Sequence, residues 1–423
     1  MKEKYIKYSN LLLKKCLNVS VGQPLIITAP VESVELIRII TEQALELGIR
    51  DICYDWYDDE IKHDHLKYLT KEEIEKHPFW NRKIYDEYAK KDAAFLMLVS
   101  DNPDLMQDID KDILSHASKT SRTSRPIYKE RQSTNDVAWC IASVSTIGWA
   151  KKVFNNDPEC VQKLWDKIFE ICLINEKDPI EAWDKKLEKS TERSKKLTEL
   201  NIKTLHYTNS LGTDLYVGLS NNTIWYGAKE IMPNGTPIIC NMPTEEIFTS
   251  PNRQETNGIV YSSKPLVYNG YIIEDFNIEF KDGKVINYDA KKGKDILGTI
   301  INGDETSCYL GECALVDYDS PISNSNIIFY TTLFDENASC HLALGTGFPN
   351  TQKGTKNKSK EELIKMGLNV SDVHVDFMIG TSDLKIEALT HDNKEITIFE
   401  NGNFILWYKT LTNNKIFEKI MSE

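Results

Sequence analysis

The pattern of the sequence changes near residue 200, and this change limits the folds that the chain can adopt. Before that point, β-rich runs alternate with helical patterns: PLIIT at 24–28 and DICYDWY at 51–57 flank a helical pattern at 31–47. A strand, a helix and a second strand at this spacing predict a βαβ unit with a parallel sheet. AAFLMLVS at 93–100 has the apolar composition of a further buried strand. Helical segments rich in Lys and Glu follow from about 146 to 200, and we interpret most of them as solvated faces.

Beyond about Ile202, short β-branched and aromatic segments such as DLYVGLS, TIWYG and YIIEDFNIEF predominate, with turns such as KDGK between them. This composition predicts mainly antiparallel β structure. We therefore expect an α/β N-terminal domain with a parallel sheet over 1–190 and a mainly antiparallel β, or α+β, domain over 191–423. The polar, lysine-rich segment 350–362 predicts a mobile loop, for which a role as a lid is open.

Composition and charge exclude several classes of protein. A chain of 423 residues is too long for one ordinary hydrophobic core, which indicates two domains. The formal net charge of -13 disfavours a nucleic-acid partner. The chain has no run of roughly 20 apolar residues and no signal-peptide pattern at its start, so we expect no membrane partner. Nine scattered cysteines without a CxxC pair disfavour a disulfide framework or a structural zinc cluster and fit a reducing cytoplasm. No nucleotide-binding glycine motif is present.

The stretch NMPTEEIFTSP, at 241–251, places two adjacent acids between two prolines. Pro243 and Pro251 fix φ and remove backbone donors, which predicts an extended segment. Neighbouring side chains of an extended segment point to opposite faces, so Glu245 and Glu246 have different roles. Two solvated acids at a strand end remain the alternative.

Two further segments carry candidate ligands inside apolar surroundings. Glu312 begins the apolar run of LGECALV, where a buried carboxylate is costly unless it is paired or bound to a metal. The alternative is an acid at a solvated strand end. LFDENASCHLALGTGFP contains Glu336 and His341. The alternative for Glu336 is a charge at a helix N-terminus. The alternative for His341 is a core histidine whose hydrogen bonds are satisfied.

The segment VHVDFMIG, at 373–380, presents a histidine and a carboxylate two residues apart. On a strand, His374 and Asp376 project to one face, whereas the opposite face is wholly apolar. Such a pair supplies two metal ligands, or one ligand and the group that orients it. A histidine–aspartate hydrogen bond without a metal is the alternative.

Taken together, these segments supply carboxylates and histidines that are all in the second half of the chain. Mixed carboxylate and imidazole ligation suits zinc, cobalt or manganese. A set of five or six ligands exceeds the need of one tetrahedral ion, so two ions bridged by a carboxylate are the simplest arrangement. Such a pair activates a shared water and polarises a carbonyl, which indicates hydrolytic chemistry.

The segments NMPTEEIFTSP, LGECALV, TLFDENASCHLALG and HVDFMIG, in this order and spacing, resemble the M29 family of metal-dependent aminopeptidases. The stretches NVSVGQPLIITAPVES and ELGIRDICYDWYDDE extend the resemblance over essentially the whole chain. The resemblance implies a two-domain, homodimeric, cytoplasmic enzyme that removes N-terminal amino acids from small peptides. It also implies two divalent ions per chain, drawn from zinc, cobalt, manganese and magnesium, held in the C-terminal domain.

The resemblance also implies roles for individual residues. Glu246 matches the first carboxylate ligand, and Glu312 matches the central carboxylate that bridges the ions. The other residues that match metal ligands, or that lie near the metals in the family, are His341, His374, Asp376 and Glu336. Glu245 faces away from the ion that Glu246 binds, and two roles stay open for it: a catalytic base, or a group that orients a ligand.

One position departs from the family. The family places a catalytic tyrosine seven residues after the histidine that matches His341, and here that position is Phe348. Phenylalanine cannot donate a hydrogen bond to a developing oxyanion, and losing such a donor costs roughly 2.7–4 kcal/mol in the transition state. Tyr309 and Thr346 are candidates to replace the hydroxyl. Two alternative functions follow: a weakened or silent homologue that binds metal and peptide, or a metal hydrolase of a non-peptide amide.

Overall fold

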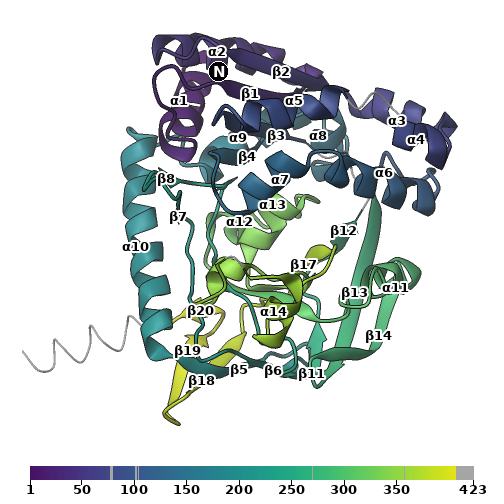
Figure 1. Cartoon of the computed structure of the whole chain (residues 1–423), viewed down its shortest axis with the longest axis vertical. Coiled ribbons are helices and arrows are strands. Elements are labelled where there is room, and N and C mark those ends of the chain that lie inside the picture. Colours follow the sequence, from purple (N-terminus) through teal and green to yellow (C-terminus); the bar gives the residue numbers. More distant parts are fainter. Residues whose placement is uncertain (77–79, 101, 103, 269, 357, 406–423) are drawn as a thin grey trace, which may run out of the picture.

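The N-terminal part of the molecule is built on a parallel sheet (Figure 1). The computed structural model describes residues 1–76, 80–100, 102, 104–268, 270–356 and 358–405. The sheet has the order β2-β1-β3-β4-β9, and all its neighbouring strands pair in parallel. The strands are β1 (Leu25–Pro30), β2 (Ile52–Tyr57), β3 (Ala94–Val99), β4 (Trp139–Ser143) and β9 (Asn241–Met242). The predicted parallel sheet is therefore confirmed.

Helices precede, connect and follow these strands along the chain. They are α1 (Lys2–Asn10), which continues through a wider π-type turn (Leu11–Cys16), a 3-10 turn (Val31–Ser33), α2 (Val34–Glu46), α3 (Asp59–Tyr68), α4 (Lys71–Lys76), α5 (Trp80–Ala89), α6 (Lys111–Thr123), α7 (Pro126–Ser133), α8 (Ile147–Val153), α9 (Cys160–Ile171) and α10 (Pro179–Leu200). In α2, the buried residues Leu36, Ile37, Ile40 and Ala44 recur at helical spacing and form the face that packs on the core. None of the helices described is long and apolar enough to span a membrane.

The long helix α10 joins the two parts of the molecule and runs along one side of it (Figure 1). Asp178 caps its N-terminus by accepting hydrogen bonds from two backbone N–H groups, and Asn201 ends it in a left-handed conformation. Trp183 packs in the N-terminal core, whereas Leu197 packs in the C-terminal core. The domain boundary expected at residue 190 lies within this helix, and its exact place stays a prediction.

The C-terminal part consists of antiparallel sheets, as predicted. The large sheet contains β5 (Ile202–Thr208), β6 (Asp214–Gly218), β11 (Thr256–Tyr261), β12 (Leu266–Tyr268), β13 (Tyr271–Lys281), β14 (Lys284–Lys292), β18 (Lys385–Thr390), β19 (Glu395–Glu400) and β20 (Asn403–Phe404). The second sheet has the order β10 (Ile247–Thr249), β15 (Leu310–Leu315), β16 (His341–Gly345) and β17 (His374–Met378). A small hairpin pairs β7 (Glu230–Ile231) with β8 (Pro237–Ile238).

Short helices connect these strands. They are α11 (Lys294–Ile301), α12 (Pro321–Asn324), α13 (Thr332–Asp335), a 3-10 turn (Glu336–Ala338), a second 3-10 turn (Pro349–Thr351) and α14 (Lys360–Lys365). The segment predicted as a mobile loop begins at this second turn. Its first part is fastened to a neighbouring segment, because the N–H of Ile224 donates to the carbonyl of Thr351 at 2.7 Å. A role of 350–362 as a lid stays a prediction.

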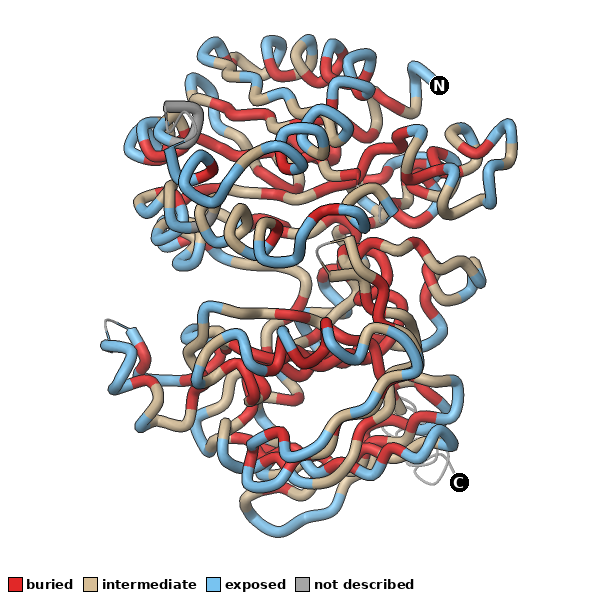
Figure 2. The backbone as a smooth tube through the Cα atoms, turned by 90° about the vertical axis from the view of Figure 1, so that its right-hand side faces the viewer, coloured by how far each residue is buried: buried red, intermediate tan, exposed pale blue. Residues whose placement is uncertain are grey.

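The second sheet packs one face on the large sheet, and buried residues concentrate in both layers (Figure 2). Along β15, Cys313 and Leu315 contribute to the core that the two sheets share. Because side chains alternate along a strand, Glu312 projects from the opposite face of β15. Asp376 on β17 lies in the same row across this face.

Asp304 fastens the chain before β15 to the segment that leads into β17. Its carboxylate accepts hydrogen bonds from the N–H of Thr306 at 2.7 Å, the hydroxyl of Ser371 at 2.5 Å and the N–H of Asp372 at 2.7 Å. Partial burial opposes ionisation of Asp304, but these donors prevail and lower its pKa to about 2.

Replacing Asp304 with asparagine is expected to lower the free energy of unfolding by about 1–3 kcal/mol at pH 7, because the donors then face an uncharged amide with one acceptor oxygen instead of a carboxylate. The depressed pKa stabilises the fold fully above the unfolded pKa near ~4, and this contribution disappears as the pH falls toward 2. Urea unfolding at pH 7 and at pH 3 measures the difference between the variant and the parent, with Asp282→Asn in an exposed turn as control. An equal loss at both pH values would contradict this account.

Candidate metal centre

The candidate ligands lie on one face of the second sheet. Glu312 on β15 pairs with Ala343 on β16, which in turn pairs with Asp376 on β17, so these residues form one row across three strands. His341 and His374 stand two residues from that row on their own strands. Residues two apart on a strand share a face, and the sheet therefore brings all four candidate ligands to the same side.

These side chains meet in two adjoining groups. Nε2 of His341 lies 3.2 Å from an oxygen of Glu246, which precedes β10. Nε2 of His374 lies 3.2 Å from Glu312 and 3.3 Å from Asp376. Ligand-type atoms of Glu246, Glu312 and His341 all lie within 4.8 Å of one another, and the same holds for Glu312, His374 and Asp376. Glu312 is common to both groups.

Backbone carbonyls orient both imidazole rings. Nδ1 of His374 lies 2.8 Å from the carbonyl oxygen of Thr346, and Nδ1 of His341 lies 3.3 Å from that of Ser339. A carbonyl oxygen only accepts, so each Nδ1 carries the proton and each Nε2 is turned toward the carboxylates. This arrangement leaves Nε2 available as a metal ligand once the ring is neutral.

Glu336 lies at the border of this cluster, in the turn after α13. Its side chain is buried, and burial together with the charges of Asp376 and Glu246 raises its pKa well above the ordinary value. The Nδ2 group of Asn337 donates to its carboxylate at 3.3 Å. Glu336 belongs to neither of the two groups of three.

Glu245 points to a different partner from Glu246, as the alternation argument predicts. Its carboxylate forms an ion pair with Lys186 on α10. Its backbone N–H donates to Oδ1 of Asn337 at 2.6 Å. Lys186 is thus an exception to the interpretation of the Lys- and Glu-rich helices as solvated faces.

The charges and burial of the cluster favour the binding of cations. Burial, reinforced by Asp376 and Glu246, raises the pKa of Glu312 to about 7. Burial alone would lower the pKa of His341, but the carboxylate of Glu246 raises it to about 10. Four carboxylates, of which Glu312 and Glu336 are buried and Glu246 and Asp376 half-buried, outnumber two imidazoles in a region of low polarity. Hard oxygen and imidazole donors in this proportion suit divalent cations, so the residues present fit a metal centre.

Phe348 stands beside the cluster and carries no hydroxyl. Its ring centroid lies 5.1 Å from that of His374 and 5.4 Å from that of Phe248. Of the two candidates to replace the hydroxyl, Tyr309 packs its ring against the guanidinium of Arg253 at 4.2 Å. Thr346 uses its backbone carbonyl to hold His374.

The sequence did not point to Glu230, which lies on β7. Its half-buried carboxylate accepts a hydrogen bond from Nδ2 of Asn135 at 3.0 Å. Burial and the nearby charge of Glu246 raise its pKa to about 7. The stretch around Glu230, GAKEIMPNG, has a polar, turn-like composition. No local signal distinguishes this acid from a solvated one.

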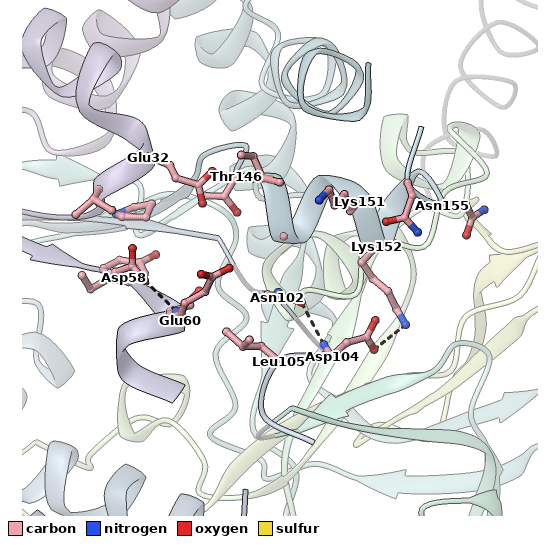
Figure 3. A pocket seen from close by; sticks show the side chains of 17 residues that line it. Glu32, Asp58, Glu60, Asn102, Asp104, Leu105, Thr146, Lys151, Lys152 and Asn155 are labelled. Atoms are coloured by element: carbon pink, nitrogen blue, oxygen red, sulfur yellow. Dashed lines mark hydrogen bonds and ion pairs between the residues drawn. The ribbon is translucent and has the colours of Figure 1, made fainter. Parts of the chain in front are cut away.

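A separate cavity of about 690 Å³ lies at the carboxyl ends of the parallel strands (Figure 3). Its walls include Glu32, Asp58 and Glu60, and an ion pair between Lys152 and Asp104 at 2.8 Å. The lining contains none of the residues of the acid–histidine cluster. Open α/β sheets commonly bind ligands at this edge, but the chemistry of the M29-like segments is concentrated elsewhere.

Comparison with known proteins decides the family. The family model described as "Thermophilic metalloprotease (M29)" matches residues 1–404. The chain belongs to the M29 family. As an M29 protein it is a metal-dependent hydrolase of peptide bonds, so the predicted family and enzyme class are confirmed, and a divalent metal is part of its chemistry.

Relatives of the M29 chain cover almost its whole length. Aminopeptidase AmpS of Bacillus subtilis (strain 168) is 40% identical over 404 residues, which are 95% of this chain and 98% of AmpS. Aminopeptidase 2 of Geobacillus stearothermophilus is 38% identical over 400 residues, which are 94% of this chain and 97% of the relative. The structure of wild-type AmpT from Thermus thermophilus superposes with a TM-score of 0.89 at 30% identity, covering 96% of this chain and 100% of AmpT. The predicted fold class is thereby confirmed.

Proposed function

We propose that this M29 protein is an aminopeptidase that releases the N-terminal residue of small peptides with the help of two divalent ions. The names of the relatives support the aminopeptidase activity. The observation that carries the two-ion site is the position of Glu312, whose carboxylate is shared by two groups of ligand-type atoms. A single ion would leave part of this donor set unused.

In this proposal each group of the cluster holds one ion. Glu246 and His341 would hold the first ion and His374 and Asp376 the second, and Glu312 is common to both groups. Glu336 completes the set from the border of the cluster. The bound ions would lower the pKa of a water between them and polarise the carbonyl of the scissile bond. The carboxylate-rich donor set is compatible with zinc, cobalt, manganese or magnesium.

The chain's own residues prepare the site for this chemistry. The carbonyl oxygens of Ser339 and Thr346 hold the two histidines in one tautomer and one orientation. Burial of Glu312 and His341 keeps bulk water away and strengthens electrostatic interactions inside the site.

The remaining expectations belong to the same proposal. We propose a cytoplasmic homodimer, which rests on the resemblance to the family. We also propose two domains, 1–190 and 191–423, that meet within α10.

Metal analysis joined to a peptidase assay tests the proposal. We expect dialysed, metal-loaded protein to retain two ions per chain, and we expect Leu- and Phe-amides and short peptides to be cleaved from the N-terminus. A chelator should abolish the activity, and adding zinc, cobalt, manganese or magnesium should restore it. Nα-acetylated peptides of the same sequence serve as the matched control. Retention of one ion per chain, or equal cleavage of acetylated peptides, would refute the proposal.

A second candidate function is favoured by Phe348. A phenylalanine at this position removes a hydroxyl from the neighbourhood of His374. The candidate is a homologue that binds metal and peptide but turns over slowly. Phe348→Tyr is the variant that separates the two candidates.

A further inference from the structure

The side chain of Asn337 connects the two segments that carry Glu246 and Glu336. It is fully buried. Its Oδ1 accepts a hydrogen bond from the N–H of Glu245 at 2.6 Å, and its Nδ2 donates to the carbonyl of Leu333 at 3.0 Å and to Glu336 at 3.3 Å. One amide group therefore joins the extended segment before β10 to the turn after α13.

Only an amide of this size satisfies all three partners. A backbone N–H needs an acceptor, whereas a carbonyl and a carboxylate need donors, and asparagine offers both from one rigid plane. Aspartate has the same shape but cannot donate to Glu336 when it is ionised. It would also add a negative charge beside a cluster that is already acidic.

A second contact restrains the same segment from the side of α10. Lys186 forms an ion pair with Glu245 and lies over the ring of Trp183 at 4.7 Å. Trp183 and Leu187 anchor this part of α10 in the N-terminal core. The residue next to Glu246 is thus tied to a rigid element of the other part of the molecule.

We infer that Asn337 is a positioning residue that sets Glu246 and Glu336 for cation binding, and that the Lys186–Glu245 pair restrains the Glu246 segment from α10. Glu245 then anchors the segment before β10. Of the two roles that the sequence left open for it, this favours orienting a ligand over acting as a catalytic base. The inference rests on the proposed function in one respect, namely that the cluster binds divalent cations.

Cation affinity, measured apart from catalysis, tests the inference. We expect Asn337→Asp to weaken binding of the ion that Glu246 contacts by roughly 10–100-fold, the range found when partners of metal ligands are removed. Equilibrium dialysis with zinc and the visible absorption spectrum of the cobalt-loaded protein are the measurements. Asn393→Asp, in an exposed turn, is the matched control. Unchanged affinity and an unchanged cobalt spectrum in Asn337→Asp would overturn the inference.

Lys186→Met keeps the test informative if Asn337→Asp does not fold. Here we expect the cation concentration at half-maximal activity to rise several-fold, with a much smaller change in the rate at saturating cation. A general structural defect would instead lower the saturated rate and the thermal midpoint together. For Glu245→Gln, a loss confined to the saturated rate, with cation affinity unchanged, would assign Glu245 to proton transfer and overturn its role as an anchor.

The same measurements separate this inference from the proposed function. If the parent protein binds no divalent cation, the proposed function fails. If the parent binds two ions and the Asn337 and Lys186 variants bind them equally well, only the positioning inference fails.

Discussion

Replacing Glu312 with glutamine is expected to abolish cation binding and peptide hydrolysis, and at the same time to make the metal-free protein more stable. Glu312 is the carboxylate that the two groups of ligand-type atoms share. Its loss therefore affects both proposed ions, and we expect affinity to fall by at least about 100-fold, the upper end of what the loss of a ligand's partner costs.

The gain in stability of the metal-free protein follows from the environment of Glu312. The side chain is buried, and Asp376 and Glu246 lie nearby, so burial and like charges raise its pKa to about 7. A carboxyl whose folded pKa is raised destabilises the fold as the pH rises from the unfolded value near ~4 through 7. Glutamine has nearly the same shape but carries no charge, so this cost disappears in the variant.

Thermal unfolding with and without a chelator distinguishes the two effects. At pH 8 in chelator, we expect the variant to melt at a higher temperature than the parent. With excess zinc or cobalt, the parent should gain stability through binding and the variant should not. Glu305→Gln, on an exposed loop close in sequence, should show neither effect. A variant that is less stable than the parent in chelator would mean that Glu312 is compensated by groups other than cations.

Features of the fold that depend on local patterns were predictable from the sequence. The runs at 24–28, 51–57 and 93–100 match β1, β2 and β3 because apolar β-rich segments between helices have few other places to pack. The common face of His374 and Asp376 followed from strand alternation alone. The different partners of Glu245 and Glu246 followed from the same rule.

Features that depend on long-range contacts were not predictable from local patterns. Asn337 and Glu245 are 92 residues apart, and neither position has a pattern that signals their hydrogen bond. Lys186 lies in a Lys- and Glu-rich segment typical of a solvated helix face, and only the path of α10 brings it to Glu245. Glu230 likewise approaches Glu246 through the small hairpin of β7 and β8, which the sequence did not indicate.

Phe348→Tyr is the second variant for which we expect a large effect. The ring of Phe348 lies beside His374, and the residue is half-buried. A hydroxyl there restores the donor that the family uses, and such a donor to a developing oxyanion contributes roughly 100–1000-fold in rate. We therefore expect the rate at saturating cation and peptide to rise by about 100-fold, with little change in cation affinity.

Steady-state kinetics on a Leu-amide, together with cation titration, measures this outcome. Phe248→Tyr is the control. The ring of Phe248 contacts that of Phe348 edge-to-face, with 5.4 Å between the ring centroids, so this variant adds a hydroxyl to a neighbouring ring. We expect this control to change the saturated rate little. If the parent is already active and Phe348→Tyr is no faster, another group supplies the missing donor. Tyr309 and Thr346 would then be the first residues to substitute. If both parent and variant bind cations and peptide but stay silent, the family's hydrolytic chemistry has been lost at more than one position.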